Sequence, residues 1–425
     1  MTKLAAPPVD PVHGTADRIQ AIDVARGAAM LMVFLSHFSL HYLYSVAGPR
    51  WFTAQALVTH IATPSFVLVS GIMLGLLRAS RRDFTRMRDK LIDRGLFLLI
   101  VGRPFIALAH VALEDDWRQP FVDQVFITDT LGVCLILGSV IATTVGDRGR
   151  LRLGLTILVS SWVLDVLWLP DNWGGSLVKE LLFGRLRGES LLYNFPLLPW
   201  FGWYLAGSGL GSIVARAQTV GGGKVAARGM FRAAAISLGI AVAARLAALP
   251  LKLATHAVGT ATVAGRAARL LALGQKLPPG ITFLFFYGAV ALLGVGAVLE
   301  WGERVPTEDT PVAWRGLAML GRNSLLAFVM QFYVYYTAVH LLPKPPLWMA
   351  PLYFAVTVAL LLGAVALCDR FRLNRMFTVG YARWAARRRA TRLAIAAPAP
   401  MLAAMPRING PRTPSGHDAV NEHRR

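Results

Sequence analysis

Residues 18–44 read RIQAIDVARGAAMLMVFLSHFSLHYLY, an apolar run that carries Arg26 and His37 eleven positions apart. Eleven residues of α-helix make about three turns and rise about 16 Å, so both side chains lie on one helix face. An ionisable residue deep in a membrane-spanning helix is a functional candidate. A guanidinium binds two phosphate oxygens at once, and a neutral imidazole accepts a proton. The pair therefore indicates chemistry on a phosphate-bearing donor inside a membrane.

Composition assigns the whole chain to the same class. Of the 425 residues, 55% are hydrophobic, and apolar runs of about twenty residues alternate with short polar loops, as in polytopic membrane proteins. We expect an all-α membrane helix bundle of ten spans, at roughly 27–45, 57–77, 93–112, 126–146, 152–169, 195–215, 231–250, 280–300, 317–341 and 348–368.

The net charge of +21 is explained by membrane topology, and no nucleic-acid partner is expected. If the N-terminus is cytoplasmic, most of the 44 Lys and Arg residues fall in cytoplasmic segments, as the positive-inside rule requires. Ten spans place both termini in the cytoplasm, and we expect the location to be a bacterial plasma membrane. Basic runs such as 387–389 would contact anionic lipids.

Three parts follow from this pattern: a disordered cytoplasmic N-terminus (1–17), a transmembrane domain (18–370) and a basic, Pro- and Ala-rich cytoplasmic tail (371–425). The two cysteines, Cys134 and Cys368, fall in apolar spans, which excludes a disulfide framework and a paired-cysteine metal site.

Small residues and two loops indicate how the spans pack and how they are connected. Small residues at Gly71 and Gly75, and at Gly207 and Gly211, have the spacing that lets membrane helices approach closely. Three glycines at 221–223 predict a flexible connector. The outer loop 251–279, which contains Lys276, either covers an extracytoplasmic site or forms a surface amphipathic helix.

Residues 18–37 resemble the first-helix signature of a superfamily of transmembrane acyltransferases. This superfamily includes the acyltransferase-3 family and the bacterial relatives of heparan-α-glucosaminide N-acetyltransferase. The sequence departs from these relatives in the string FVMQ at 328–331. Relatives often have a histidine where this chain has Gln331, and we therefore expect no role for position 331. Further family-like blocks follow in order: WFTAQALVTHIATPSFVLVSG (51–71), ITDTLG (127–132), FPLLPWFG (195–202), KLPPG (276–280) and LGRNS (320–324).

The resemblance implies transfer of an acyl group, such as acetyl, from cytoplasmic acyl-coenzyme A to a hydroxyl or amine of an extracytoplasmic or lipid-linked glycan. Acyl-coenzyme A is then a donor substrate; no covalently bound cofactor and no metal is expected, and an oligomer is compatible with this function. The resemblance further implies that His37 acts with Arg26, that His60 is the polar residue before the Pro-x-Phe block, and that Asp129 is the acid of the fourth-helix block.

A thioester donor needs a base for the nucleophile and hydrogen-bond donors for the developing oxyanion. His37 is the candidate base, or else a hydrogen-bonded interior histidine. Arg26 is the candidate ligand of the coenzyme A phosphates or of the thioester end of the donor, or else a snorkelling arginine paired with Asp23. Arg322 and Asn323, near the cytoplasmic end of the ninth span, would complete a phosphate cradle, or else serve topology and packing.

The remaining candidates lie on other helices. His60 is a second candidate base or acyl carrier, or an interfacial histidine. Asp129 is either catalytic or an ordinary helix N-cap. Arg103, followed by Pro104, needs a partner in the third span, and we expect Asp165 to be its counter-ion in the wall of a substrate cavity.

Three classes of function fit these residues. The first is the membrane acyltransferase. The second is a secondary transporter, because buried Arg, His and Asp also line transport pathways, although two corresponding broken helices are not apparent in the two halves of the sequence. The third is a structural or sensor protein without chemistry.

Overall fold

The computed structural model describes residues 14–80, 83–114, 116–184, 193–258, 262–302, 311–373 and 377–396. Chain contacts divide it at Ala382 into a large unit, treated below, and a second unit that begins at Arg383. Of the predicted N-terminal segment (1–17) and tail (371–425), residues 1–13, 374–376 and 397–425 lie outside the described residues, whereas residues 14–17 and 381–396 are helical.

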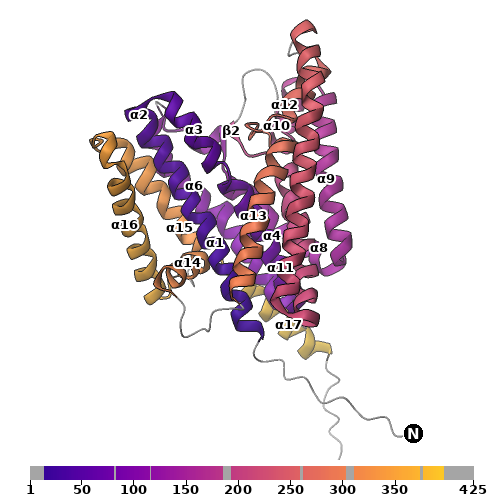
Figure 1. Cartoon of the computed structure of the whole chain (residues 1–425). Helices are drawn as coiled ribbons and strands as arrows, with labels where there is room; N and C mark the ends of the chain where they lie inside the picture. The colour runs from indigo at the N-terminus through magenta and orange to yellow at the C-terminus, as the bar shows by residue number, and fades with distance from the viewer. Residues whose placement is uncertain are drawn as a thin grey trace, which may run out of the picture. The chain divides into compact units, whose positions relative to one another are not determined.

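Nearly every described element is a helix, which confirms the all-α expectation (Figure 1). The first ten are α1 (Gly14–Phe38), α2 (Tyr44–Ala47), α3 (Pro49–Thr59), α4 (Ala62–Ser80), α5 (Thr85–Phe97), α6 (Arg103–His110), α7 (Gln119–Val122), α8 (Ile127–Thr144), α9 (Asp147–Leu167) and α10 (Trp173–Leu182). The others are α11 (Leu197–Val258), α12 (Val263–Leu270), α13 (Ile281–Gly302), α14 (Val312–Arg322), α15 (Ser324–Phe332), α16 (Ala350–Arg370) and α17 (Tyr381–Ala396).

Short elements join these helices. Three π-helical turns are η1 (Ser39–Leu43), η2 (Leu98–Gly102) and η5 (Tyr333–Val339), and two 3₁₀ turns are η3 (Val111–Leu113) and η6 (Leu347–Met349). The described strands are β1 (Gln124–Val125) and β2 (Tyr193–Asn194), two residues each, which pair in parallel.

Seven helical segments of the described chain are long and apolar enough to cross a membrane, and an eighth counts if α14 and α15 form one bent span. The expectation was ten. Residues 152–167 of the predicted span 152–169 are helical as part of α9, but the charged residues of α9, which include Arg150, Arg152 and Asp165, lower the mean hydropathy of this helix. The seven are Ala21–Ala47, Pro49–Ser80, Thr85–Leu113, Ile127–Thr144, Gly222–Leu251, Ile281–Gly302 and Leu347–Arg370.

Helix α11 contains two of the predicted spans, 195–215 and 231–250, in one helical run. The run reverses direction near Gly222, whose φ of 73° lies in the left-handed region that favours glycine. Trp203 and Ser237 both contact Phe285 of α13: the rings of Trp203 and Phe285 lie 5.7 Å apart, and Ser237 donates to the Phe285 carbonyl at 2.7 Å. Because a straight helix would separate these residues by about 50 Å, the predicted glycine connector is the turn of a helical hairpin.

Helix α4 packs against α1, α11 and α13 and forms the centre of the bundle. A Cβ on Gly71 would overlap the carbonyl oxygen of Tyr204, and one on Gly211 would overlap that of Ile72. The predicted small-residue contact is therefore confirmed, since glycine lets the α4 and α11 backbones touch.

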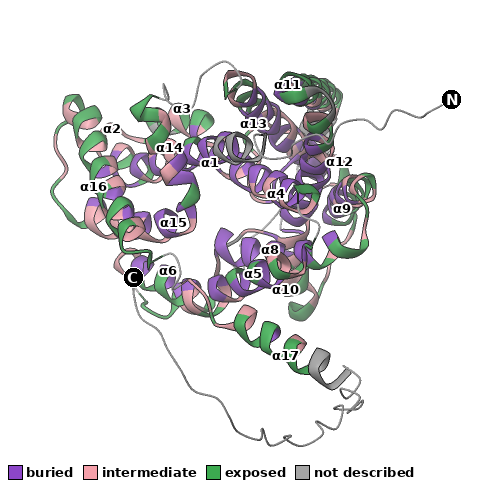
Figure 2. Ribbon diagram, turned by 90° about the horizontal axis from the view of Figure 1, so that it is seen from below, coloured by how far each residue is buried: buried purple, intermediate pink, exposed green. Residues whose placement is uncertain are grey.

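The outer surface is apolar where the bundle would meet lipid. Helix α16 exposes Leu352, Val356 and Leu360, one turn apart on one face. Figure 2 shows the contrast between this exposed helix and the buried inner faces of α1, α4 and α13. Such a pattern is expected of a helix whose solvent is hydrocarbon.

Candidate functional site

The site begins at a break between α14 and α15, whose axes differ by 82°. Asn323 separates them with φ −102° and ψ 19°, and its carbonyl accepts the first bond of α15, from the Ala327 N–H at 3.0 Å. Helix α1 lies directly against α14, because a Cβ on Gly27 or on Gly321 would overlap a backbone carbonyl of the other helix. This contact brings the sequence-predicted residues of two distant segments together.

A cavity of about 470 Å³ lies at this junction, and we call it the cationic cavity. Its lining includes Arg26, Arg322 and Asn323, as the sequence predicted. Lys90 and Arg94 of α5 also line it, together with the single carboxylate of Asp23; Arg26 donates to the Ser324 hydroxyl at 2.5 Å. Four cationic side chains and the amino-terminal end of α15 favour an anion here.

One wall of the cationic cavity comes from the carboxyl-terminal part of the large unit. Phe377 lines the cavity and packs against Phe97 with ring centroids 4.9 Å apart. The carboxylate of Asp93 fixes the residues that come directly after Phe377 in the chain. It accepts from the Thr378 hydroxyl, from the Val379 N–H at 2.9 Å and from the Tyr381 N–H at 3.2 Å. Asp93 therefore positions Phe377 over the cavity.

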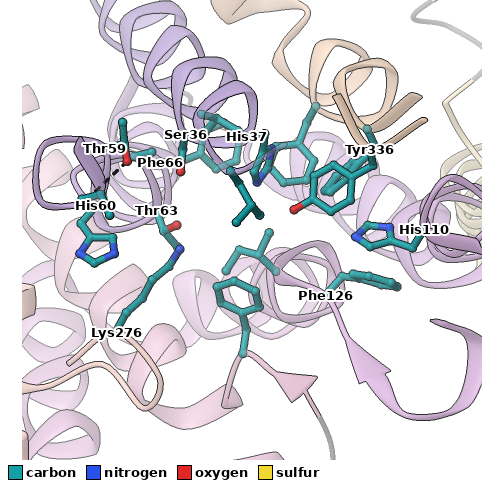
Figure 3. A pocket seen from close by; sticks show the side chains of 18 residues that line it. Ser36, His37, Thr59, His60, Thr63, Phe66, His110, Phe126, Lys276 and Tyr336 are labelled. Atoms are coloured by element: carbon teal, nitrogen blue, oxygen red, sulfur yellow. Dashed lines mark hydrogen bonds between the residues drawn. The ribbon is translucent and has the colours of Figure 1, made fainter. Parts of the chain in front are cut away.

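A second cavity, of about 210 Å³, lies farther along α1, and we call it the histidine cavity (Figure 3). His37 and His60, the two candidate bases, both line it. They come from different segments, since His60 ends α3 and its ring lies against Phe283 at 5.7 Å between centroids. The sequence did not indicate that these two histidines share one cavity.

His37 is held by a side chain that sequence reasoning set aside. Its Nδ1 lies 2.6 Å from Oε1 of Gln331, which is fully buried in α15. Since an amide oxygen only accepts, Nδ1 carries the proton, and Nε2 of a neutral His37 is free to accept one. Position 331, for which no role was expected, therefore contacts the candidate base, and the amide oxygen of Gln331 favours the tautomer with the proton on Nδ1.

Three further residues of the histidine cavity were not assigned to a site from the sequence: Lys276, His110 and Tyr336. The ring centroid of Tyr336 lies 5.1 Å from that of His37 and 4.3 Å from that of His110. The signal for His110 was a histidine in an apolar span, the same signal that identified His37. Lys276 lies in the outer loop 251–279, for which the sequence left open a cover over a site or a surface amphipathic helix.

The two cavities share a wall formed by Phe66 of α4 and Phe328 of α15, which line both and whose ring centroids lie 5.8 Å apart. Arg26 and His37 thus sit on opposite sides of one aromatic pair although they belong to one helix. The space beside α1 is therefore divided into two cavities, one containing Arg26 and the other His37.

Three predicted site residues lie outside both cavities. The Asp129 carboxylate accepts from the Phe126 N–H at 3.0 Å and lies 3.4 Å from Nε of Arg103. Phe126 is the N-cap of α8, and Asp129 closes a capping box from the first turn, so its alternative assignment as the N-cap is wrong by one turn of chain. The expected pair of Arg103 with Asp165 was wrong: Asp165 lies 3.6 Å from the ammonium of Lys179.

Comparison with known families supports the resemblance. The family model described as heparan-alpha-glucosaminide N-acetyltransferase, catalytic, matches residues 18–239, which is just over half of the chain. The match includes Arg26, His37 and His60, and it ends before Lys276 and the α14–α15 break. Comparison with curated proteins gives no significant match.

Proposed function

Because the chain belongs to the heparan-α-glucosaminide N-acetyltransferase family of transmembrane acyltransferases, we propose that it transfers an acetyl group from acetyl-coenzyme A to a sugar. The donor's phosphates bind in the cationic cavity and the acceptor binds in the histidine cavity. We place the protein in a bacterial plasma membrane with the cationic cavity toward the cytoplasm, in agreement with the distribution of Lys and Arg.

The observation that carries this proposal is the placement of Arg26 and His37 on either side of the Phe66–Phe328 wall. Their separation along α1 is about 16 Å, a distance that the extended pantetheine arm of coenzyme A spans. With its phosphates beside Arg26 and Arg322, the donor reaches His37 with its thioester when the two aromatic rings turn aside.

The chemistry follows from the tautomer of His37. Nε2 removes the proton from the acceptor hydroxyl or amine as that atom attacks the thioester carbonyl carbon. The tetrahedral intermediate collapses with cleavage of the C–S bond, and the coenzyme A thiolate takes the proton from the His37 imidazolium. Gln331, hydrogen-bonded to Nδ1, stabilises the positive charge that forms on the ring between these two steps.

The test uses the purified protein in lipid nanodiscs with radiolabelled acetyl-coenzyme A and glucosamine. His37→Ala should lower the rate of acetyl transfer by about 10²–10⁴, the usual loss on removal of a general base. His340→Ala is the matched control, because His340 lines neither cavity. A His37→Ala protein that is as active as the control refutes the assignment. Movement of the sugar across the membrane without acetyl transfer favours the transporter instead.

A further inference from the structure

The histidine cavity has two chemically different sides (Figure 3). Ser36, Thr59, Thr63 and His60 bring hydroxyl and imidazole groups to one side, with Lys276 beside them. The opposite side is aromatic and includes Phe126 and the ring of Tyr336, and other phenylalanines complete the lining. Hydroxyl donors facing an aromatic surface fit a sugar, which has polar edges and an apolar face.

Lys276 reaches the cavity from the segment between α12 and α13 (Figure 3). That segment is held in place by the Trp162 indole, which donates to the Pro279 carbonyl at 2.9 Å, and by the Gln275 side chain, which donates to the Leu277 carbonyl at 2.8 Å. The ammonium lies 5.9 Å from the Phe195 ring centroid, and Figure 3 shows it extending toward Thr63. A positioned backbone therefore presents this cation to the cavity.

The charge of Lys276 has no counter-charge among the residues that the structure describes. None of their carboxylates lines the histidine cavity, and none of their ion pairs includes Lys276. The other titratable groups that face it are His37, His60, His110 and Tyr336. Burial lowers the pKa of Lys276 from 10.5 to about 8, so the amine is still mainly protonated at neutral pH. A half-buried cation without a counter-charge is costly, and an anionic ligand removes that cost.

We propose that Lys276 selects an acidic acceptor: it binds a carboxylate or phosphate group of the sugar while the acetylated hydroxyl or amine faces His37. This inference rests on the proposed function, since it names the class of acceptor for the same cavity. Lys276 is a specificity-determining residue here and takes no part in the proton transfer.

The experiment compares three acceptors that differ in charge: glucosamine, glucosamine 6-phosphate and 2-amino-2-deoxyglucuronic acid. For the unmodified protein we expect the KM of at least one acidic sugar to be well below that of glucosamine. Lys276→Gln should raise that KM about ten-fold to a hundred-fold, the usual effect of losing a hydrogen bond between charged groups, and should change the KM of glucosamine much less. The acidic sugar that is affected identifies the group as phosphate or carboxylate.

Two variants separate a binding role from a structural one. Lys276→Arg should keep the preference for the acidic sugar and should keep it at pH 9.5, where the amine of the unmodified protein has lost its proton. Lys344→Gln is the matched control, because Lys344 lies outside both cavities. Equal changes in KM for acidic and neutral sugars in Lys276→Gln, or no preference in the unmodified protein, would overturn the proposal.

A binding measurement distinguishes this failure from failure of the proposed function. Acidic sugars should raise the melting temperature of the unmodified protein more than glucosamine does, and Lys276→Gln should remove the difference. This result does not depend on turnover. If no protein transfers acetyl to any sugar but the difference in stabilisation persists, the enzyme assignment fails and the anion site stands.

Discussion

The hydrogen bond between Gln331 and His37 offers the sharpest test of the catalytic geometry. Gln331→Leu keeps the size and the apolar surroundings of the side chain but removes the oxygen 2.6 Å from Nδ1 of His37. The imidazole then loses the partner that keeps the proton on Nδ1 and the positive charge that forms during transfer is less stabilised. Removing one partner of a buried hydrogen bond costs about 1–3 kcal/mol. If that cost falls on the transition state, kcat drops about five-fold to a hundred-fold.

The assay is single-turnover acetyl transfer at saturating donor and acceptor, so that binding does not contribute. Gln331→Glu restores an acceptor for Nδ1 and should recover most of the loss. Gln218→Leu, the same substitution in α11 away from both cavities, should leave kcat unchanged. A Gln331→Leu protein that is folded, binds donor normally and retains full kcat would show that the tautomer of His37 does not limit transfer.

Three further predictions concern the cavities and the packing that forms them. Arg26→Gln should raise the KM for acetyl-coenzyme A about ten-fold or more while the KM for the sugar stays constant, because it removes a charged donor to phosphate; an unchanged donor KM would move the phosphates elsewhere. Asp93→Asn should weaken donor binding in isothermal titration calorimetry, since it loosens the segment that places Phe377 over the cationic cavity; equal affinity would show that this wall is not needed. Gly71→Leu should lower the melting temperature and the yield of folded protein, because its side chain overlaps the Tyr204 backbone; Gly239→Leu, where a Cβ meets nothing within 4 Å, is the control that should fold normally.

Local features of the sequence were enough to predict some parts of the fold and of the candidate site. Arg26 and His37 share a helix face because the α-helical period relates residues close in sequence. Gly71 and Gly211 signalled a close contact between helices because a glycine stripe has few other uses in a membrane. The apolar runs required helices, since hydrocarbon leaves no other partner for backbone N–H and C=O groups.

Partners far apart in sequence were not predictable in the same way. Asp165 pairs with Lys179 and Asp129 with Arg103, whereas the expected pair was Arg103 with Asp165. The sequence does not show which helices are neighbours. The role of Gln331 was missed for the same reason, since its partner is 294 positions away.

The sequence by itself determined that this is a membrane-embedded helical protein with an arginine and a histidine on one face of its first helix, because hydropathy and helical periodicity act over short stretches of chain. The tertiary structure alone decided that these residues face two cavities with a shared aromatic wall, that Lys276 lines the same cavity as His37, and that Gln331 is hydrogen-bonded to His37. The physical reason is that the 82° break at Asn323 and the hairpin at Gly222 determine which helices touch, and helix packing, not sequence separation, determines which side chains meet.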